Sequence, residues 1–165
     1  MPHSFRVLLV EDDDSLRVCL REFLADLGWA VADAARGEEA IRLVEQQRFD
    51  FSILDFHLPG GANGLQVFEA IRRIKSLPAI LMSGEANREE TARARQAGFF
   101  TFLRKPLELE RLRNSMFELI AHHFGGQFGG PLPGRPQPRD PRSLRSFDDP
   151  EQPLQPPRRP DSPPC

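Results

Sequence analysis

The chain has 165 residues, which fits one domain of ordinary size and leaves little room for a second. Hydrophobic residues make up 39%, charged residues 28%, and the formal net charge is −2, so bulk charge predicts no binding to nucleic acid or to an anionic membrane. The absence of a long apolar run, of a secretory hydrophobic region and of a disulfide framework favours a cytoplasmic protein without a membrane anchor.

Strand and helix patterns alternate through residues 1–124, with short connections between them. The expected elements are, in chain order, a strand at 6–10, a helix ending at Leu27, a strand at 29–32, a helix at 37–47, a strand at 51–54, a helix at 65–74, a strand at 78–82, a helix at 87–97, a strand at 99–103 and a helix at 107–123. Asp14 or Ser15 is expected to cap the first helix, which Gly28 ends, and Gly98 is expected to end the fourth. Five strand–helix units predict an α/β fold of the doubly wound class, with a parallel sheet covered by helices on both faces.

The composition changes sharply near residue 125. Residues 125–165 hold twelve of the sixteen prolines and five of the twelve glycines, with very few apolar side chains. Such a segment buries too little surface to offset the entropy lost on ordering. The sequence therefore predicts a folded domain at 1–124 and a disordered Pro/Gly-rich tail at 125–165.

Acidic residues follow two of the predicted strands. Glu11 and Asp12 come after the first strand, and Asp55 closes the third. The carboxyl ends of parallel strands meet at one edge of a sheet, so these carboxylates are expected to lie together and to need a cation. Mg²⁺ prefers oxygen ligands and keeps several waters, so these three acids and the backbone carbonyl of His57 suffice for a magnesium site.

Two further polar residues end strands at the same predicted edge. Ser83 closes the fourth strand, and Lys105 follows the fifth, directly before Pro106. A carboxylate is able to attack phosphorus, and phosphoryl transfer requires positioning and neutralisation of charge. Lys105 and Ser83 supply an ammonium and a hydroxyl for a phosphoryl group held on Asp55. An X-Pro bond at Lys105–Pro106 is a candidate for the cis form in a tight turn.

Five segments in order carry a family resemblance. They are LLVEDD at 8–13, FDFSILD at 49–55, LPG at 58–60, PAILMSG at 78–84 and AGFFTFLRKP at 97–106. With these segments, residues 6–121 resemble the receiver domain of bacterial two-component response regulators. The resemblance covers about three quarters of the chain. It implies a flavodoxin-like (βα)5 fold with a five-stranded parallel sheet.

The resemblance also implies a role for each matched residue. Asp55 is the aspartate that accepts a phosphoryl group from a phosphohistidine of a sensor histidine kinase or a phosphotransfer protein. The acidic pair at 11–12 holds Mg²⁺ together with it. Ser83 is the hydroxyl residue that moves toward the phosphoryl group, Lys105 pairs with that group, and Phe102 occupies the aromatic switch position.

The function implied is that of a signalling switch, which catalyses only its own phosphorylation and dephosphorylation and is not otherwise an enzyme. No DNA-binding or catalytic output domain is recognised after residue 124, so the expected readout is contact with a downstream protein. A phosphorelay intermediate and a phosphate sink remain open as alternatives. A magnesium-dependent phosphatase of the haloacid-dehalogenase type is disfavoured, because His57 stands where those enzymes carry a second aspartate. A nucleotide- or flavin-binding protein is disfavoured because no Gly-x-Gly-x-x-Gly or Walker A segment is present.

One loop length and three residues depart from the usual receiver pattern. The loop between Asp55 and Gly64 is one residue longer, Glu stands at 11, Ser replaces the commoner Thr at 83, and Phe102 lacks a tyrosine hydroxyl. These departures are expected to tune the lifetime of the phosphorylated form and to preserve the activity.

Overall fold

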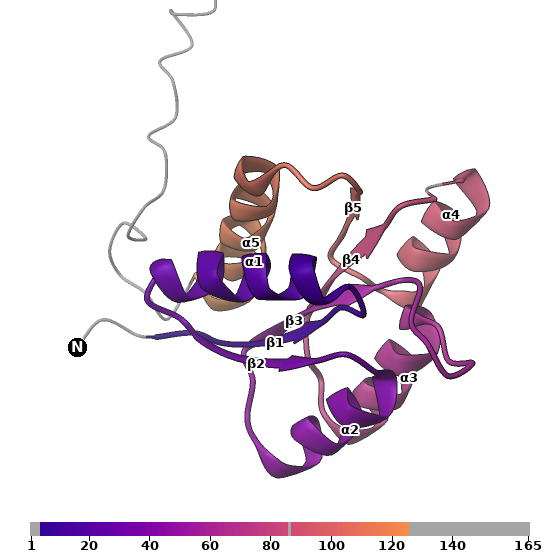
Figure 1. The fold of residues 1–165 in the computed structure, drawn as a ribbon, viewed down its shortest axis with the longest axis horizontal. Helices are drawn as coiled ribbons and strands as arrows, with labels where there is room; N and C mark the ends of the chain where they lie inside the picture. Colours follow the sequence, from indigo (N-terminus) through magenta and orange to yellow (C-terminus); the bar gives the residue numbers. More distant parts are fainter. Residues whose placement is uncertain (1–3, 86, 126–165) are drawn as a thin grey trace, which may run out of the picture. The chain divides into compact units, whose positions relative to one another are not determined.

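The structure is a computed structural model that describes residues 4–85 and 87–125. The tail predicted at 125–165 lies, apart from its first residue, outside the described residues. In the described part, strands and helices alternate along the chain (Figure 1). The elements are β1 (Arg6–Val10), α1 (Asp14–Asp26), β2 (Ala30–Ala34), α2 (Gly37–Gln46), β3 (Phe51–Asp55), α3 (Gly64–Ile74), β4 (Ala79–Ser83), α4 (Arg88–Ala97), β5 (Thr101–Arg104) and α5 (Leu109–Phe124).

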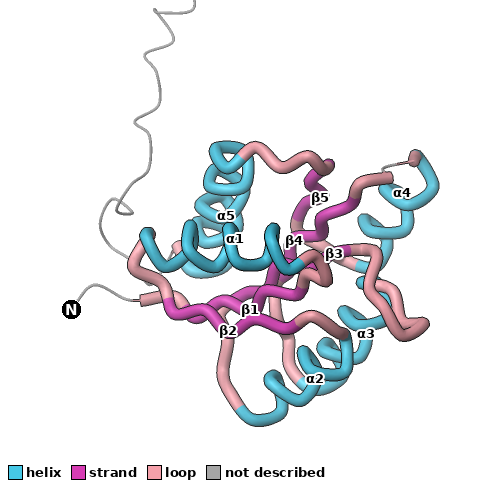
Figure 2. The backbone as a smooth tube through the Cα atoms, viewed as in Figure 1, coloured by secondary structure: helices cyan, strands magenta, loops and turns pink. Residues whose placement is uncertain are grey.

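The strands form one parallel sheet in the order β2-β1-β3-β4-β5, with loops joining strands and helices at both ends (Figure 2). Successive side chains of a strand point to opposite faces, so β1 contributes to two cores. Val7 and Leu9 pack with α1 and α5 on one face, whereas Leu8 and Val10 pack with α2, α3 and α4 on the other. The predicted doubly wound, flavodoxin-like (βα)5 fold is confirmed.

The element boundaries differ from the predictions by up to two residues. β2 runs from Ala30 to Ala34 rather than from 29 to 32, because Trp29 packs into the core before the strand begins. The prediction of Asp14 or Ser15 as the first helix cap was wrong. Asp13 is the cap, since its carboxylate accepts a hydrogen bond from Leu16 N at 2.7 Å.

The two helix-ending glycines were predicted correctly. Gly28 follows α1 with φ +80° and Gly98 ends α4 with φ +93°, a backbone conformation that glycine adopts without strain. Both glycines turn the chain back toward the sheet and thereby place the following strands. Among the described residues, no helix combines the length and hydropathy needed to cross a bilayer.

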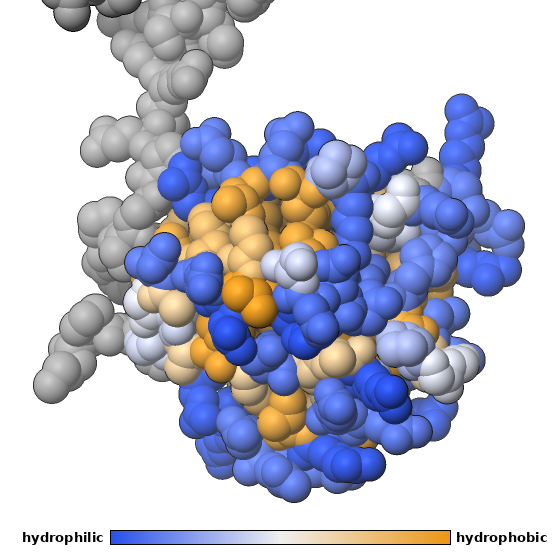
Figure 3. All heavy atoms as spheres, in the orientation of Figure 1, coloured by the Kyte–Doolittle hydropathy of each residue, from blue (hydrophilic) through white to orange (hydrophobic). Residues whose placement is uncertain are grey.

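Polar side chains cover most of the face seen in Figure 3, and one of its apolar areas lies in the region of α1 and α5. Leu16 and Phe23 of α1, and Leu107 just before α5, pack against the core on this side of the sheet and remain partly exposed.

Candidate functional site

The strand register places the predicted site residues at one edge of the sheet. Val10 of β1 lies opposite Leu54 of β3, so Glu11 and Asp55 follow side by side. Hydrogen bonds continue the ladder beyond the strands, with Lys105 N donating to Ser83 O at 2.8 Å. The sequence therefore brings these four groups together through strand pairing, although 94 residues separate Glu11 from Lys105 along the chain.

Three carboxylates form a cluster at this edge. One oxygen each of Glu11, Asp12 and Asp55 lies within 4.8 Å of the others. Glu11 and Asp55 are buried, whereas Asp12 is exposed. Buried acids at this spacing repel each other when ionised, and exposure of Asp12 gives a cation access to the cluster.

Lys105 neutralises part of this charge. Its Nζ lies 3.0 Å from Asp55 Oδ2 and 2.8 Å from Glu11 Oε2. The lysine donates a hydrogen bond to Asp55, but Glu11 Oε2 is buried and accepts no hydrogen bond from any described residue. The contact to Glu11 is thus an ion pair without hydrogen-bond geometry. A buried oxygen with unused lone pairs is a ligand atom for a hard cation, so the residues present fit Mg²⁺.

The pKa values follow from this burial and pairing. Burial raises the pKa of Glu11 to about 7, although the contacts with Lys105 and Asp13 act in the opposite direction. For Lys105 burial lowers the pKa, but Glu11 and Asp55 outweigh it and the net pKa is raised. Lys105 is therefore a permanent positive charge beside Asp55 at neutral pH.

Ser83 is fully buried at the end of β4. Its hydroxyl accepts a hydrogen bond from Glu85 N at 3.3 Å and donates to Glu90 Oε2 at 3.5 Å. Sequence reasoning missed Glu90, which lies in the first turn of α4 after the N-cap Asn87. An acidic residue in the first turn of a helix that starts just after the site was the available indication. Through Glu90, the position of α4 is connected directly to Ser83.

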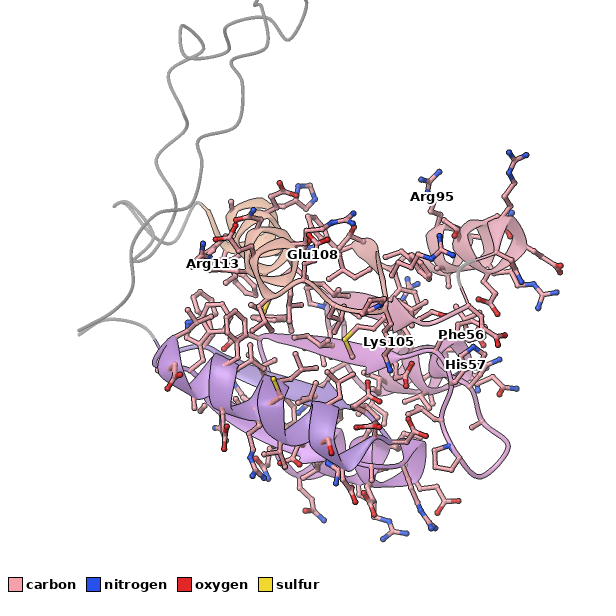
Figure 4. The ribbon with its side chains drawn as sticks, turned by 45° about the horizontal axis from the view of Figure 1, so that its top comes forward. Phe56, His57, Arg95, Lys105, Glu108 and Arg113 are labelled. Carbon is pink, nitrogen blue, oxygen red and sulfur yellow. The ribbon has the colours of Figure 1, made fainter. Side chains whose placement is uncertain are left out.

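The remaining predicted residues surround the cluster. His57 is exposed, and its backbone N–H donates to Asp55 Oδ1 at 3.3 Å; the predicted use of its carbonyl for a metal stays a prediction. Phe102 is half-buried against the core on the α4 side of the sheet. The Lys105–Pro106 bond is cis. Figure 4 shows Lys105 in the same region as Phe56 and His57, and Arg95 projecting outward from α4.

Bacterial chemotaxis and transcriptional regulatory proteins are similar in sequence to this chain. The chain is 30% identical over 119 residues to the chemotaxis protein CheY of Pseudomonas aeruginosa, covering 70% of this chain and 95% of that protein. It is 36% identical over 102 residues to the transcriptional regulatory protein AfsQ1 of Streptomyces coelicolor. That match covers 62% of this chain and 45% of AfsQ1.

Solved structures share the fold. The Vibrio cholerae chemotaxis protein CheY4 superimposes with a TM-score of 0.66 at 28% identity, covering 70% of this chain and 98% of that one. A CheY-like receiver domain protein from Methanospirillum hungatei gives a TM-score of 0.69 at 23% identity, covering 73% and 96%. The family model of the response regulator receiver domain matches residues 7–117. The chain therefore belongs to the response regulator receiver domain family, whose members are signalling switches.

Proposed function

We propose that residues 1–124 form a phosphoacceptor receiver in which Asp55 takes a phosphoryl group from a phosphohistidine, in a Mg²⁺-dependent reaction. The donor is a sensor histidine kinase or a phosphotransfer protein. The observation that carries the proposal is the Asp55 carboxylate itself, which is buried at the sheet edge, 3.0 Å from Lys105 Nζ, and shares an acidic cluster with Glu11 and Asp12.

The reaction is a displacement at phosphorus. An Asp55 carboxylate oxygen attacks, the new O–P bond forms, and the N–P bond to the donor histidine breaks, so that the histidine leaves with the electron pair and takes up a proton. Lys105 holds its charge beside the attacking oxygen and then beside the acyl phosphate. The Ser83 hydroxyl lies at the same edge and supplies a hydrogen-bond donor to a phosphoryl oxygen once it leaves Glu90.

Glu11, Asp12 and Asp55, with the backbone carbonyl of His57, would hold the magnesium ion. When bound, the ion neutralises charge on the carboxylates and on the incoming phosphoryl group. Oε2 of Glu11 supports this assignment, because it is buried and its only charged contact is the ion pair with Lys105 among the described residues, so it keeps lone pairs for a hard cation.

The output is a change in a protein-binding surface. A phosphoryl group adds negative charge beside Ser83. When the serine hydroxyl donates to that group instead, its hydrogen bond to Glu90 of α4 is broken. α4, β5 and α5 are the elements next to this switch, and exposed arginines on them, such as Arg95 and Arg104, help to select an acidic partner surface. A partner that prefers the rearranged face reads the phosphorylated state.

The direct test is incubation of the full chain with acetyl phosphate, with and without Mg²⁺, followed by intact mass measurement. One adduct of about 80 Da that requires Mg²⁺ is expected, consistent with addition of one phosphoryl group.

Asp55→Asn should lose the adduct. Asp50→Asn is the matched control, because Asp50 is an aspartate near the opposite end of β3 whose Oδ2 accepts from Arg6 N, and it should keep the adduct. An equal adduct in Asp55→Asn would exclude Asp55 as the acceptor. Continuous turnover of phosphomonoesters would indicate a phosphatase instead.

A further inference from the structure

Arg17 of α1 reaches from its helix to the ends of two strands. Its side chain is only 16% exposed although it is charged. Nη1 donates to the backbone oxygen of Glu11 at 2.8 Å, Nε donates to Asp33 Oδ2 of β2 at 3.1 Å, and Nη2 pairs with Asp14 at 2.5 Å. The guanidinium is therefore held by three acceptors, the Glu11 carbonyl, Asp33 of β2 and Asp14 of α1.

The contact with the Glu11 carbonyl constrains Asp12. A peptide unit is planar, so the bond that fixes the oxygen of Glu11 also fixes the orientation of the following nitrogen and Cα, which belong to Asp12. The Glu11 side chain is held independently, because it is fully buried and contacts Lys105. Asp12 is exposed and lacks such packing. Its place in the cluster thus depends on the backbone between Glu11 and α1.

We propose that Arg17 is a positioning residue for the cation cluster, which holds the Glu11–Asp12 peptide in the orientation that lets Asp12 share a cation with Glu11 and Asp55. The inference rests on the proposed function, since it assigns Mg²⁺ to the cluster. Groups that orient metal ligands by hydrogen bonding affect metal affinity without touching the ion. Asp33 acts through Arg17 by holding the guanidinium in place.

The sign of the effect separates positioning from simple electrostatics. Arg17 is a cation next to the cluster, so its charge alone opposes the binding of a second cation. Removal of that charge should tighten Mg²⁺ binding if electrostatics dominate. Positioning predicts the reverse, a weaker site.

The experiment is calorimetric titration of Mg²⁺ into the unphosphorylated full chain. Arg17→Gln is expected to weaken Mg²⁺ binding about tenfold. Arg21→Gln is the matched control, because it removes the same charge and the same kind of contact to Asp33 (Arg21 Nη1–Asp33 Oδ1, 3.5 Å) from an exposed arginine on α1. It should change the affinity by less than about twofold. Equal or tighter binding in Arg17→Gln, or equal weakening in Arg21→Gln, would overturn the proposal.

A double-mutant cycle tests the role of Asp33. Asp33→Asn is expected to weaken Mg²⁺ binding in the wild-type background but to have no further effect in Arg17→Gln, because it acts through the same guanidinium. Additive losses would assign Asp33 a separate, long-range charge effect and would contradict that part of the proposal.

If Arg17→Gln does not fold, as judged by circular dichroism, comparison of Arg17→Lys with Arg21→Lys decides the same question. A lysine at 17 keeps the charge but cannot reproduce the guanidinium fork.

Amide hydrogen exchange in the metal-free protein gives a readout that does not depend on the ion. The Asp13 amide donates to Glu11 Oε1 at 3.1 Å. Its exchange rate should rise in Arg17→Gln and stay the same in Arg21→Gln.

The two proposals fail differently. Failure of this inference leaves the adduct on Asp55 but makes Mg²⁺ binding indifferent to Arg17, whereas failure of the proposed function removes the adduct and leaves the dependence on Arg17.

Discussion

The carboxyl group of Glu11 lies in conflicting surroundings. Its side chain is completely buried, which disfavours the ionised form, while Lys105 and the Asp13 amide favour it. Burial is the largest of these effects and raises the pKa from 4.5 to about 7. Between these two values the folded protein holds a proton at Glu11 that the unfolded chain has already released.

This difference predicts a pH-dependent stability for the metal-free protein. Because folding takes up a proton, the free energy of unfolding should be highest below pH 4.5 as far as this group is concerned, and should fall as the pH rises to about 7. The shift corresponds to about 3 kcal/mol at most. Urea unfolding in the presence of a chelator at several pH values measures it. Glu11→Gln, which does not titrate, should lack this component; an identical pH profile in that variant would contradict the assignment.

Ser83 offers a second prediction at the level of one atom. Ser83→Ala removes the side-chain hydroxyl that the proposed function assigns to a phosphoryl oxygen, so adduct formation from acetyl phosphate should slow by about 100-fold. Mg²⁺ affinity should stay near the wild-type value, since the carboxylates are untouched. Ser52→Ala is the control. Ser52 is equally buried but lies earlier, in β3, with its hydroxyl near Pro78 O. A similar loss of rate in both variants would indicate a general packing effect.

Between elements, the close approach of α3 to the end of β3 positions Asp55. Gly64, the first residue of α3, donates its N–H to Phe56 O at 2.8 Å. A Cβ built on Gly64 would lie 2.2 Å from the backbone oxygen of Asp55. Helix and strand can meet at this distance only because residue 64 has no side chain.

Gly64→Ala should therefore destabilise the protein by about 1–3 kcal/mol and slow phosphorylation, because either α3 or the Asp55 peptide must move. Denaturant unfolding and the mass assay measure the two effects. Gly84→Ala is the control, since a Cβ there meets no atom within 4 Å and its φ is not positive; its stability should change by less than about 0.5 kcal/mol. Wild-type behaviour of Gly64→Ala would contradict the close-approach argument.

The sequence was sufficient to predict the order and type of the elements and the gathering of Glu11, Asp55 and Lys105 at one sheet edge, for a physical reason. Strands buried on both faces read as apolar runs, and a parallel sheet places all their carboxyl ends together. It was insufficient for the hydrogen bonds of individual side chains. The cap at Asp13, the bond from Ser83 to Glu90 and the reach of Arg17 to Glu11 depend on rotamers and on the rotation of a helix about its axis. Periodicity fixes neither.

For the molecule as a whole, one sheet separates two cores and connects both to the site. Strands β1, β3 and β4 contribute side chains to each core and end at the acidic cluster or at Ser83. Trp29, the single tryptophan, lies in the core with α1 and α5, in edge-to-face contact with Phe5 and Phe51. Its fluorescence therefore reports unfolding without being part of the site.

Binding of Mg²⁺ at the sheet edge should stabilise the entire described domain. A ligand that binds only the folded state adds RT ln(1 + [L]/Kd), which is about 1.4 kcal/mol when free Mg²⁺ is about tenfold above its Kd. Urea unfolding followed by Trp29 fluorescence and by circular dichroism should shift by this amount in both signals, because a small single domain unfolds cooperatively. Asp55→Asn removes one of the three carboxylates and should show a smaller shift at the same Mg²⁺ concentration. A shift seen by circular dichroism but not by Trp29 would mean that the two cores unfold separately, and an undiminished shift in Asp55→Asn would place the ion elsewhere.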